Sequence, residues 1–579
     1  MKEIAIRVGG QAGDGIASIG ESVTRCFSRM GYPIFGINAY QSVIRGGHVW
    51  FHARASEKPV HSPGDGIDIL YALDRLTVDV HAALLRPGGT VIHDPEKFPL
   101  ASSDVPAGLH ILPVPTLEIA RKYTSQSILQ NAAGIGATTY LSGIPLDMIQ
   151  TVLTDSFGRK AGDVVTWNVG ACADGYHYAE KQAAVHPPVL AKKGPPKLLM
   201  TGNQAIGLGS AAAGLKFLVQ YPMTPATSIM HWLASHSRPL GIVVKQSEDE
   251  LASINMAIGA SYAGVRAMTA SSGGGFALMT EGLGMAGMTE TPVVVVDAAR
   301  TGPSTGLPTK TEQGDLNLLL GAGQSEFPRV ILAPSNPVEA YRMMITAFDL
   351  AERYQTPALV LTDFHLAECW EGVDRSEIDL NVPIAPLVTV EPNSSDFRRY
   401  RDTPSGVSPR AFPGQEGLNH ITLSDEHDEW GHDVSDIRAG IPASVSIREK
   451  MMAKRMRKLQ GLAKDAPPPV LEGPADAPLT FVAWGSTVGA VRDAMEVLHE
   501  KGKATNLLRF PTLYPLDPKV VHSMFAKTHK TLLVEGNYSG QFGRLLRGET
   551  GIDLPHKFLK YDGEPFYPHQ IIAHALEVM

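Results

Sequence analysis

Three short segments carry side chains that could do chemistry, and each of them follows a run of apolar residues. Thr224 stands between two prolines in Tyr221-Pro222-Met223-Thr224-Pro225. Because proline restricts its own backbone and that of the residue before it, this stiff turn presents one hydroxyl. Glu248 lies at the mouth of a predicted helix of small residues. Arg300 ends an apolar strand, where its guanidinium could hold a carboxylate by two parallel hydrogen bonds.

Most of these features also have a purely structural explanation when each is taken alone. A turn kept only for its stiffness is the commoner reason for a sequence such as Tyr221–Pro225. Asp249 and Glu250 are expected to cap a helix and to stabilise its dipole. The run Thr269–Gly275 has almost no side chains, so that a ligand or the backbone of a partner could approach it closely. Arg300 keeps its functional interpretation, because ligands bind at the carboxyl ends of strands in open α/β sheets.

Two glycine-rich turns resemble phosphate-binding loops but lack the residues that define them. In Gly9–Gly15 the glycine spacing does not match a dinucleotide-binding loop, and Ile16 and Ala17 stand where a P-loop needs lysine and serine or threonine. Gly-Asp-Gly occurs at 13–15 and again at 64–66, in neither place with the asparagine pair that completes a metal–diphosphate site. The first loop could still receive an anion at a helix N-terminus, and a tight turn for packing explains it equally well.

Composition and cysteine content argue against several classes of protein. The 579 residues carry a net charge of −8 and are 44% hydrophobic, which is typical of a globular protein without the basic excess that nucleic acid requires. Cys26, Cys172 and Cys369 are too few for a four-thiolate iron–sulfur cluster and favour a reducing cytosol. His427 and His432 lie among acids, where a solvated loop is favoured over a metal site. We expect a cytoplasmic protein, since neither a signal peptide nor a membrane-spanning run occurs.

Strand, glycine turn and helix alternate along most of the chain. This alternation predicts an α/β fold with three open, mostly parallel sheets, and the unbroken Val/Ile/Leu runs at 291–299 and 356–363 are typical of buried parallel strands. Proline and lysine at 186–196 indicate a linker. The charged stretch 371–476 indicates a long loop-rich connector with one helix at 446–462, whose basic face we expect to be solvated or ion-paired. The predicted domains are 1–185, 197–370 and 477–579.

Four groups of motifs occur in an order that resembles the 2-oxoacid:ferredoxin oxidoreductases, in the form whose γ and α parts are fused into one alpha subunit. The resemblance covers nearly the full length. It rests on GGQAGDGI with Tyr40 and Arg45-Gly46-Gly47, on YPMTP, QSE, TASSGGG and AARTGPSTGLPT, on RRYRDTPSGVSPRAFPG with DEHDEWG, and on EGNYSGQFGRLLR. In turn these look like a γ domain, a pyrimidine-binding α domain, the connector and a transketolase-like C-terminal domain. Met223 and Ala226 depart from the family pattern at positions without assigned chemistry.

This resemblance implies thiamine diphosphate at an interface with a separate beta subunit, which would hold the diphosphate, Mg²⁺ and at least one [4Fe–4S] cluster. Glu248 would hydrogen-bond N1′ of the aminopyrimidine ring, and burial that raises the pKa of its carboxyl would favour this proton sharing. Thr224 and Arg300 would hold the carboxylate and carbonyl of the substrate. No metal ligand is expected in this chain. The expected cofactor-binding residues are Tyr221, Pro222, Ser271, Gly273 and Gly274, and those possible on the coenzyme A side are Gly13, Arg45 and Asn537.

The reaction that the resemblance implies is the reversible conversion of 2-oxoglutarate and coenzyme A to succinyl-CoA and CO2, with electrons passed to ferredoxin. An (αβ)2 assembly is expected, and the chain should be inactive without its beta subunit because it carries half of a site. A pyruvate or branched-chain 2-oxoacid enzyme is the alternative within the family. A non-catalytic subunit is a more distant one, since Glu248, Thr224 and Arg300 are all present. The residue that binds the distal carboxylate of 2-oxoglutarate is not identifiable from the sequence.

Overall fold

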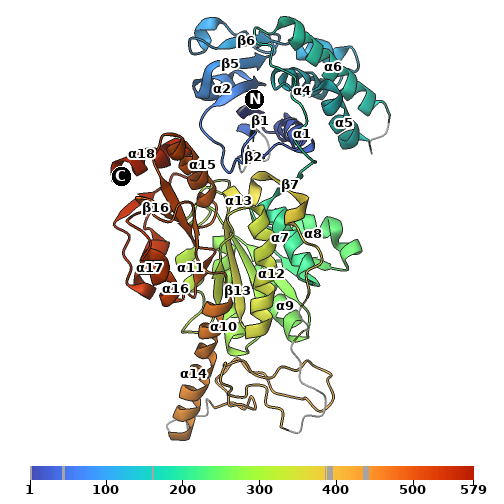
Figure 1. Cartoon of the computed structure of the whole chain (residues 1–579). Helices are drawn as coiled ribbons and strands as arrows, with labels where there is room; N and C mark the ends of the chain where they lie inside the picture. The colour runs from blue at the N-terminus through green and yellow to red at the C-terminus, as the bar shows by residue number, and fades with distance from the viewer. Residues whose placement is uncertain (1–2, 42–45, 159–161, 385–386, 388–395, 435–441) are drawn as a thin grey trace. The chain divides into compact units, whose positions relative to one another are not determined.

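The computed structural model describes residues 3–41, 46–158, 162–384, 387, 396–434 and 442–579 (Figure 1). They divide into two compact units, each with its own apolar core; the first unit contains one sheet and the second contains two. The first unit comprises Met1–Met200, Glu368–Glu377 and Tyr567–His569, and the second comprises Thr201–Ala367, Ile378–Phe566 and Gln570–Met579.

The first unit contains an eight-stranded sheet in the order β6-β5-β4-β1-β3-β2-β14-β7. From β6 to β1 the strands are parallel, whereas the pairings of β1 with β3, β3 with β2, and β2 with β14 are antiparallel. The strands are β1 (Glu3–Gln11), β2 (Ile34–Ala39), β3 (His48–Ser56), β4 (Ile67–Ala72), β5 (Leu85–His93), β6 (His110–Pro113), β7 (Leu198–Thr201) and β14 (Trp370–Val373). The last of these spans the predicted boundary between the second domain and the connector at residues 370 and 371, and it joins the sheet of the first unit by pairing Trp370 with Gly36.

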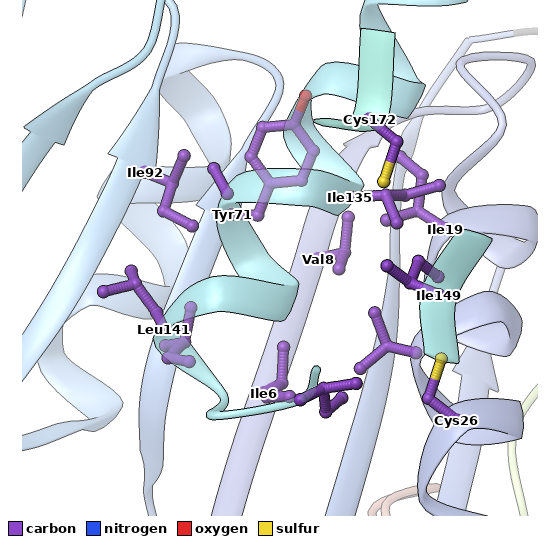
Figure 2. Packing of buried hydrophobic residues seen from close by; sticks show 14 of the residues in the cluster. Ile6, Val8, Ile19, Cys26, Tyr71, Ile92, Ile135, Leu141, Ile149 and Cys172 are labelled. Carbon is purple, nitrogen blue, oxygen red and sulfur yellow. The ribbon is translucent and has the colours of Figure 1, made fainter. Parts of the chain in front are cut away.

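Helices cover this sheet over an apolar core that includes alternate residues of β1, among them Ile6 and Val8 (Figure 2). The helices are α1 (Ile16–Arg29), α2 (Arg75–His81), α3 (Thr116–Arg121), α4 (Gln130–Leu141), α5 (Leu146–Phe157) and α6 (Val164–Gln182). Cys26 and Cys172 point into the same core, and burial raises the pKa of both thiols. These two cysteines therefore act as packing residues.

The second unit is built around a seven-stranded sheet in the order β18-β12-β13-β11-β10-β8-β9. All neighbouring pairs in it are parallel except β12 with β18, which confirms the mostly parallel arrangement expected from the apolar runs. The strands are β8 (Phe217–Gln220), β9 (Val243–Gln246), β10 (Ala267–Ser271), β11 (Val293–Ala299), β12 (Val330–Leu332), β13 (Pro357–Asp363) and β18 (Thr512–Tyr514). The helices that precede the connector are α7 (Gly202–Ala212), α8 (Thr227–Leu240), α9 (Glu250–Tyr262), α10 (Gly273–Met288), α11 (Leu316–Leu320), α12 (Pro337–Tyr354) and α13 (Phe364–Glu368).

A smaller, five-stranded sheet in the same unit has the order β15-β17-β16-β19-β20 and is parallel except at β15. Its strands are β15 (Val470–Glu472), β16 (Leu479–Ala483), β17 (Thr505–Arg509), β19 (Lys530–Glu535) and β20 (His556–Leu559). Its helices are α15 (Thr487–Glu500), α16 (Pro518–Phe525), α17 (Gln541–Thr550) and α18 (Pro568–Val578). One strand of this region, β18, is not part of the small sheet. It is the edge strand of the seven-stranded sheet.

The connector contains the predicted helix, α14 (Pro442–Asp465), whose basic residues are ion-paired as expected and in part fully buried. Lys454 and Lys458 both contact the carboxylate of Glu290, in the latter case at 2.6 Å. Arg399 donates from Nη2 to the backbone carbonyl of Glu290 at 2.8 Å. Although burial alone would raise the pKa of Glu290, the two lysines hold it well below its usual range, and burial lowers the pKa of Lys458 to about 8. This buried cluster joins the connector to the α10–β11 loop.

Candidate functional site

Arg300 and Thr224 come together at the carboxyl edge of the seven-stranded sheet. Thr224 follows β8 and Arg300 follows β11, and only β10 lies between these two strands. The Nη1 atom of Arg300 donates to the backbone carbonyl of Thr224 at 2.8 Å, and both residues are half-buried. Burial lowers the pKa of Arg300 while the Asp315 carboxyl opposes this change. Because a guanidinium has five N–H donors and this contact uses one, the arginine retains capacity for a carboxylate ligand.

Two buried amide side chains donate hydrogen bonds to the turn that carries Thr224. The sequence patterns did not indicate either of them. Asn203 donates from Nδ2 to the carbonyl of Pro225 at 2.8 Å, and Gln220 donates from Nε2 to the carbonyl of Ala226 at 3.0 Å. Both amides are fully buried. Gln220 ends the apolar strand β8, and a polar residue at such a position was the available signal. Rigid side chains of this kind fix a binding turn in place.

Two neighbouring glutamates at the start of α9 occupy very different environments. Glu248 is exposed, whereas Glu250 is 2% exposed and its Oε1 accepts from the Ser271 hydroxyl at 3.1 Å. Asp249 between them is the N-cap of α9, as expected, since its side chain accepts from the amide of Ala252 at 2.7 Å. The described residues of this chain therefore do not bury Glu248, whereas Glu250, in the first turn of α9 as expected, is buried against a serine.

The glycine turn before α10 contains both tightly packed and open positions. A Cβ at Gly273 would lie 2.5 Å from Oδ2 of Asp315, and one at Gly275 would lie 2.1 Å from Oε1 of Glu250, so neighbouring carboxyls require both glycines. A Cβ at Gly274 would instead enter open space among the described residues. Of the predicted cofactor-binding residues in this turn, Gly274 is thus the one that a ligand can approach from outside.

A pair of acidic residues near this turn was missed by the sequence analysis. Asp297 lies within the apolar strand β11, two residues before its end, and is fully buried, while Asp315 lies beside the start of α10. Burial and the charge of Asp315 raise the pKa of Asp297 well above its ordinary value. Burial and the charge of Glu312 raise the pKa of Asp315 to about 6. Both shifts favour the protonated form of these carboxyls near the arginine, and an aspartate within an apolar strand was the signal for the pair.

The remaining predicted residues are distributed over both units. Tyr221 is exposed and Pro222 half-buried on the Thr224 turn. Gly13 has a positive φ of 102° in the loop before α1, with open space at the position of a Cβ. Arg45 lies outside the described residues. Asn537 is buried, and its Nδ2 donates to the carbonyl of Gln313 at 2.9 Å, so it joins two parts of the second unit.

Two kinds of feature are absent from the described residues, a cluster of metal ligands and a membrane-spanning helix. No three His, Cys, Asp or Glu residues among them are arranged to hold a metal ion. None of the helices in the described part of the chain is long and apolar enough to cross a membrane.

Three family models match the chain, in the order predicted for its domains. Residues 5–178 match pyruvate ferredoxin/flavodoxin oxidoreductase, residues 209–443 match the thiamine diphosphate-binding part of pyruvate flavodoxin/ferredoxin oxidoreductase, and residues 474–546 match the transketolase C-terminal domain.

Curated and solved relatives extend over the whole chain. The alpha subunit of 2-oxoacid:ferredoxin oxidoreductase 2 from Aeropyrum pernix is 30% identical, covering 100% of this chain and 98% of that one. The 2-oxoglutarate oxidoreductase subunit KorA of Mycobacterium tuberculosis is 28% identical over 99% of this chain and 91% of its own length. A solved structure, 2-oxoglutarate:ferredoxin oxidoreductase from Magnetococcus marinus with 2-oxoglutarate, coenzyme A and succinyl-CoA bound, is 33% identical with a TM-score of 0.92, covering 100% of this chain and 99% of that one.

Proposed function

Because this chain belongs to the 2-oxoacid:ferredoxin oxidoreductase family, as an alpha subunit, we propose that it takes part in the CoA-dependent oxidative decarboxylation of 2-oxoglutarate. The products are succinyl-CoA and CO2, and the electrons pass through an iron–sulfur cluster of a beta subunit to ferredoxin. The single observation that carries the assignment to this site is the contact between Arg300 and the Thr224 turn, at the sheet edge where ligands of open α/β proteins bind.

The site fits the pyrimidine half of thiamine diphosphate. Open space at Gly274 and the exposed carboxylate of Glu248 lie at the starts of neighbouring helices, α10 and α9, on the same edge of the sheet. When bound, thiamine diphosphate supplies the electron sink that decarboxylation of a 2-oxoacid requires. Glu248 would hold the proton at ring atom N1′, and it gains the burial that this task favours only when the cofactor and the partner cover it.

The arginine and the threonine turn would bind the part of the substrate that all 2-oxoacids share. Arg300 orients the C1 carboxylate by paired hydrogen bonds, and the Thr224 hydroxyl lies on the same turn for the carbonyl. The stiffness given by Asn203 and Gln220 keeps the two groups in one geometry.

The partner would cover the α9 and α10 side of this site. Leu251 and Met256 of α9 and Leu278 of α10 are exposed at 48%, 42% and 47%, on helices that otherwise consist largely of small residues. Large exposed apolar side chains beside small ones favour an extensive protein interface. We place the beta subunit there, carrying the diphosphate, Mg²⁺ and [4Fe–4S] sites, in an (αβ)2 assembly.

The choice of 2-oxoglutarate is supported by the relatives named for it, above all by the full-length structural neighbour. Pyruvate and branched-chain 2-oxoacids are the alternatives. The test is to purify the chain with its native partner and to follow the reduction of a viologen dye with each 2-oxoacid, with and without coenzyme A. Faster CoA-dependent reduction with pyruvate than with 2-oxoglutarate would reject the substrate assignment. Oxidation of any 2-oxoacid by the chain alone would reject the two-subunit site.

A further inference from the structure

Gln313 lies at the carboxyl edge of the five-stranded sheet, although it belongs to the loop that follows Arg300. Its side chain is 2% exposed. Nε2 donates to the carbonyl of Trp484 at 2.8 Å, and Oε1 accepts from the amide of Gly536 at 2.8 Å. Its backbone amide donates to the carbonyl of Gly536 at 2.7 Å, and its carbonyl accepts from Asn537 at 2.9 Å. All its polar groups thus engage the five-stranded region.

The position of these contacts is unusual for an open α/β sheet. Trp484 follows β16 and Gly536 follows β19, which are neighbouring parallel strands. The crevice outside the carboxyl ends of such strands is where ligands of this fold class bind. Here the side chain of Gln313, from the loop between β11 and α11, hydrogen-bonds to the residues that follow both strands.

The loop that Gln313 anchors is closed on itself and begins at Arg300. Thr301 donates from its amide to the carbonyl of Lys310 at 3.1 Å, and Leu307 donates to the carbonyl of Thr301 at 3.0 Å. The amide of Gly302 donates to the carboxylate of Glu312 at 3.3 Å. The residues that follow Arg300 and those that precede Gln313 are therefore hydrogen-bonded to one another.

We propose that Gln313 is a positioning residue for the substrate arginine: the five-stranded region clamps the 300–315 loop through this side chain and thereby sets the geometry in which Arg300 meets the carboxylate of a 2-oxoacid. The role of Arg300 in this statement rests on the proposed function, whereas the clamp itself rests on the contacts of Gln313. A second amide strengthens it, since Gln541 donates from Nε2 to the carbonyl of Gly314 at 2.7 Å.

Two substitutions separate the clamp from general stability. Gln313→Leu keeps the size of the side chain but leaves the amide of Gly536 and the carbonyl of Trp484 buried without this partner. Gln313→Glu keeps the acceptor; its carboxyl can donate to Trp484 only when protonated, and burial favours protonation. Gln460→Leu, at an exposed position of α14, is the matched control.

The kinetic experiment uses the chain purified with its native partner. For Gln313→Leu we expect KM for the 2-oxoacid to rise about 10-fold at every pH, the effect of roughly one lost buried hydrogen bond, with KM for coenzyme A unchanged. Relative to wild type, Gln313→Glu should show the raised KM at pH 8 and approach wild type at pH 6. An unchanged 2-oxoacid KM in Gln313→Leu, or an equal rise in both KM values, overturns the proposal.

Amide hydrogen exchange on the full chain tests the clamp without any assay of activity. Peptides that span residues 300–312 should exchange about 10-fold faster in Gln313→Leu than in wild type and Gln460→Leu, because local opening costs less free energy. Unchanged exchange in this segment overturns the clamp. A wild-type complex that oxidises no 2-oxoacid, together with faster exchange in Gln313→Leu, would reject the proposed function while leaving the clamp confirmed.

Discussion

Helix α10 connects two regions whose charged residues differ in burial and in the partners that the chain provides for them. Around its start, at the sheet edge where α9 also begins, Glu248 is exposed, the position beside Gly274 is open, and Arg300 uses one donor on a backbone carbonyl. Beyond its end, Glu290 is fully buried against Lys454 and Lys458. A carboxylate whose partners are all supplied by its own chain stabilises a fold. A charged group left open at a sheet edge is available to a ligand or to another subunit, and four substitutions can test this contrast.

Glu248→Gln should give the largest effect, and on activity alone. Turnover in the complex with the partner should fall by about 10²–10⁴-fold, because the proton relay to the cofactor is lost. Since Glu248 is exposed, the urea midpoint of the isolated chain should not change. The measurement is deuterium exchange at C2 of bound thiamine diphosphate, and near-normal exchange in the variant would remove Glu248 from this role.

Glu290→Gln should lower the free energy of unfolding and leave turnover unchanged. Removing the carboxylate leaves two lysines buried without their counter-charge, which costs about 3–5 kcal/mol of unfolding free energy. Turnover per folded molecule should stay at the wild-type level. Urea unfolding followed with kcat checks both statements, and Glu96→Gln, at an exposed pair with Arg121, is the control that should leave stability unchanged. Lost turnover in molecules that remain folded would break the contrast.

The acidic pair at the site predicts a dependence of stability on pH. The pKa of Asp315 is raised from 3.8 to about 6 in the folded chain, so its contribution is fully present below pH 3.8 and is lost as the pH rises through 6. Asp315→Asn should therefore reduce the fall in stability between pH 4.5 and pH 7, as measured by urea unfolding at the two pH values. The same fall in the variant would show that another group titrates.

Arg300→Lys should give the smallest effect, and it should be uniform across substrates. A lysine cannot make paired hydrogen bonds to a carboxylate, and the loss is about 1–2 kcal/mol, or roughly 10-fold in KM. Because the C1 carboxylate is common to every 2-oxoacid, KM should rise for all of them. Assays with 2-oxoglutarate, pyruvate and a branched-chain 2-oxoacid check this, with Arg353→Lys as the control. A rise for one substrate only would assign Arg300 to the distal part of that substrate.

Local patterns in the sequence predicted the elements well. The apolar runs at 291–299 and 356–363 correspond to β11 and β13, and the stretch at 446–462 lies within α14. These predictions succeed because strands and helices depend on periodicity within one segment. The order of motifs also predicted the family, which the full-length relatives confirm.

Contacts between distant segments could not be predicted in this way. Nothing within the residues around Trp370 indicates that they pair with β2, and nothing around Glu290 indicates a buried lysine more than 160 positions later. Gln313 likewise has its partners at Trp484 and Gly536. Such pairings depend on which surfaces the fold brings together, and a single sequence contains no periodic signal for them.

The place of β18 in the seven-stranded sheet limits where the chain can be cut into separately folding pieces. Residues 512–514 come from the C-terminal region, yet they form the last strand beside β12, and Ala333 donates to the carbonyl of Pro511 at 2.8 Å. A chain that ends before β16 would lack β18, and the backbone N–H and C=O groups of β12 would form an unpaired sheet edge, which is prone to aggregation. The last hundred residues therefore share a sheet with the residues before the connector, and we expect an expression boundary between the second and third family matches, at residues 443 and 474, to lower the solubility of both pieces.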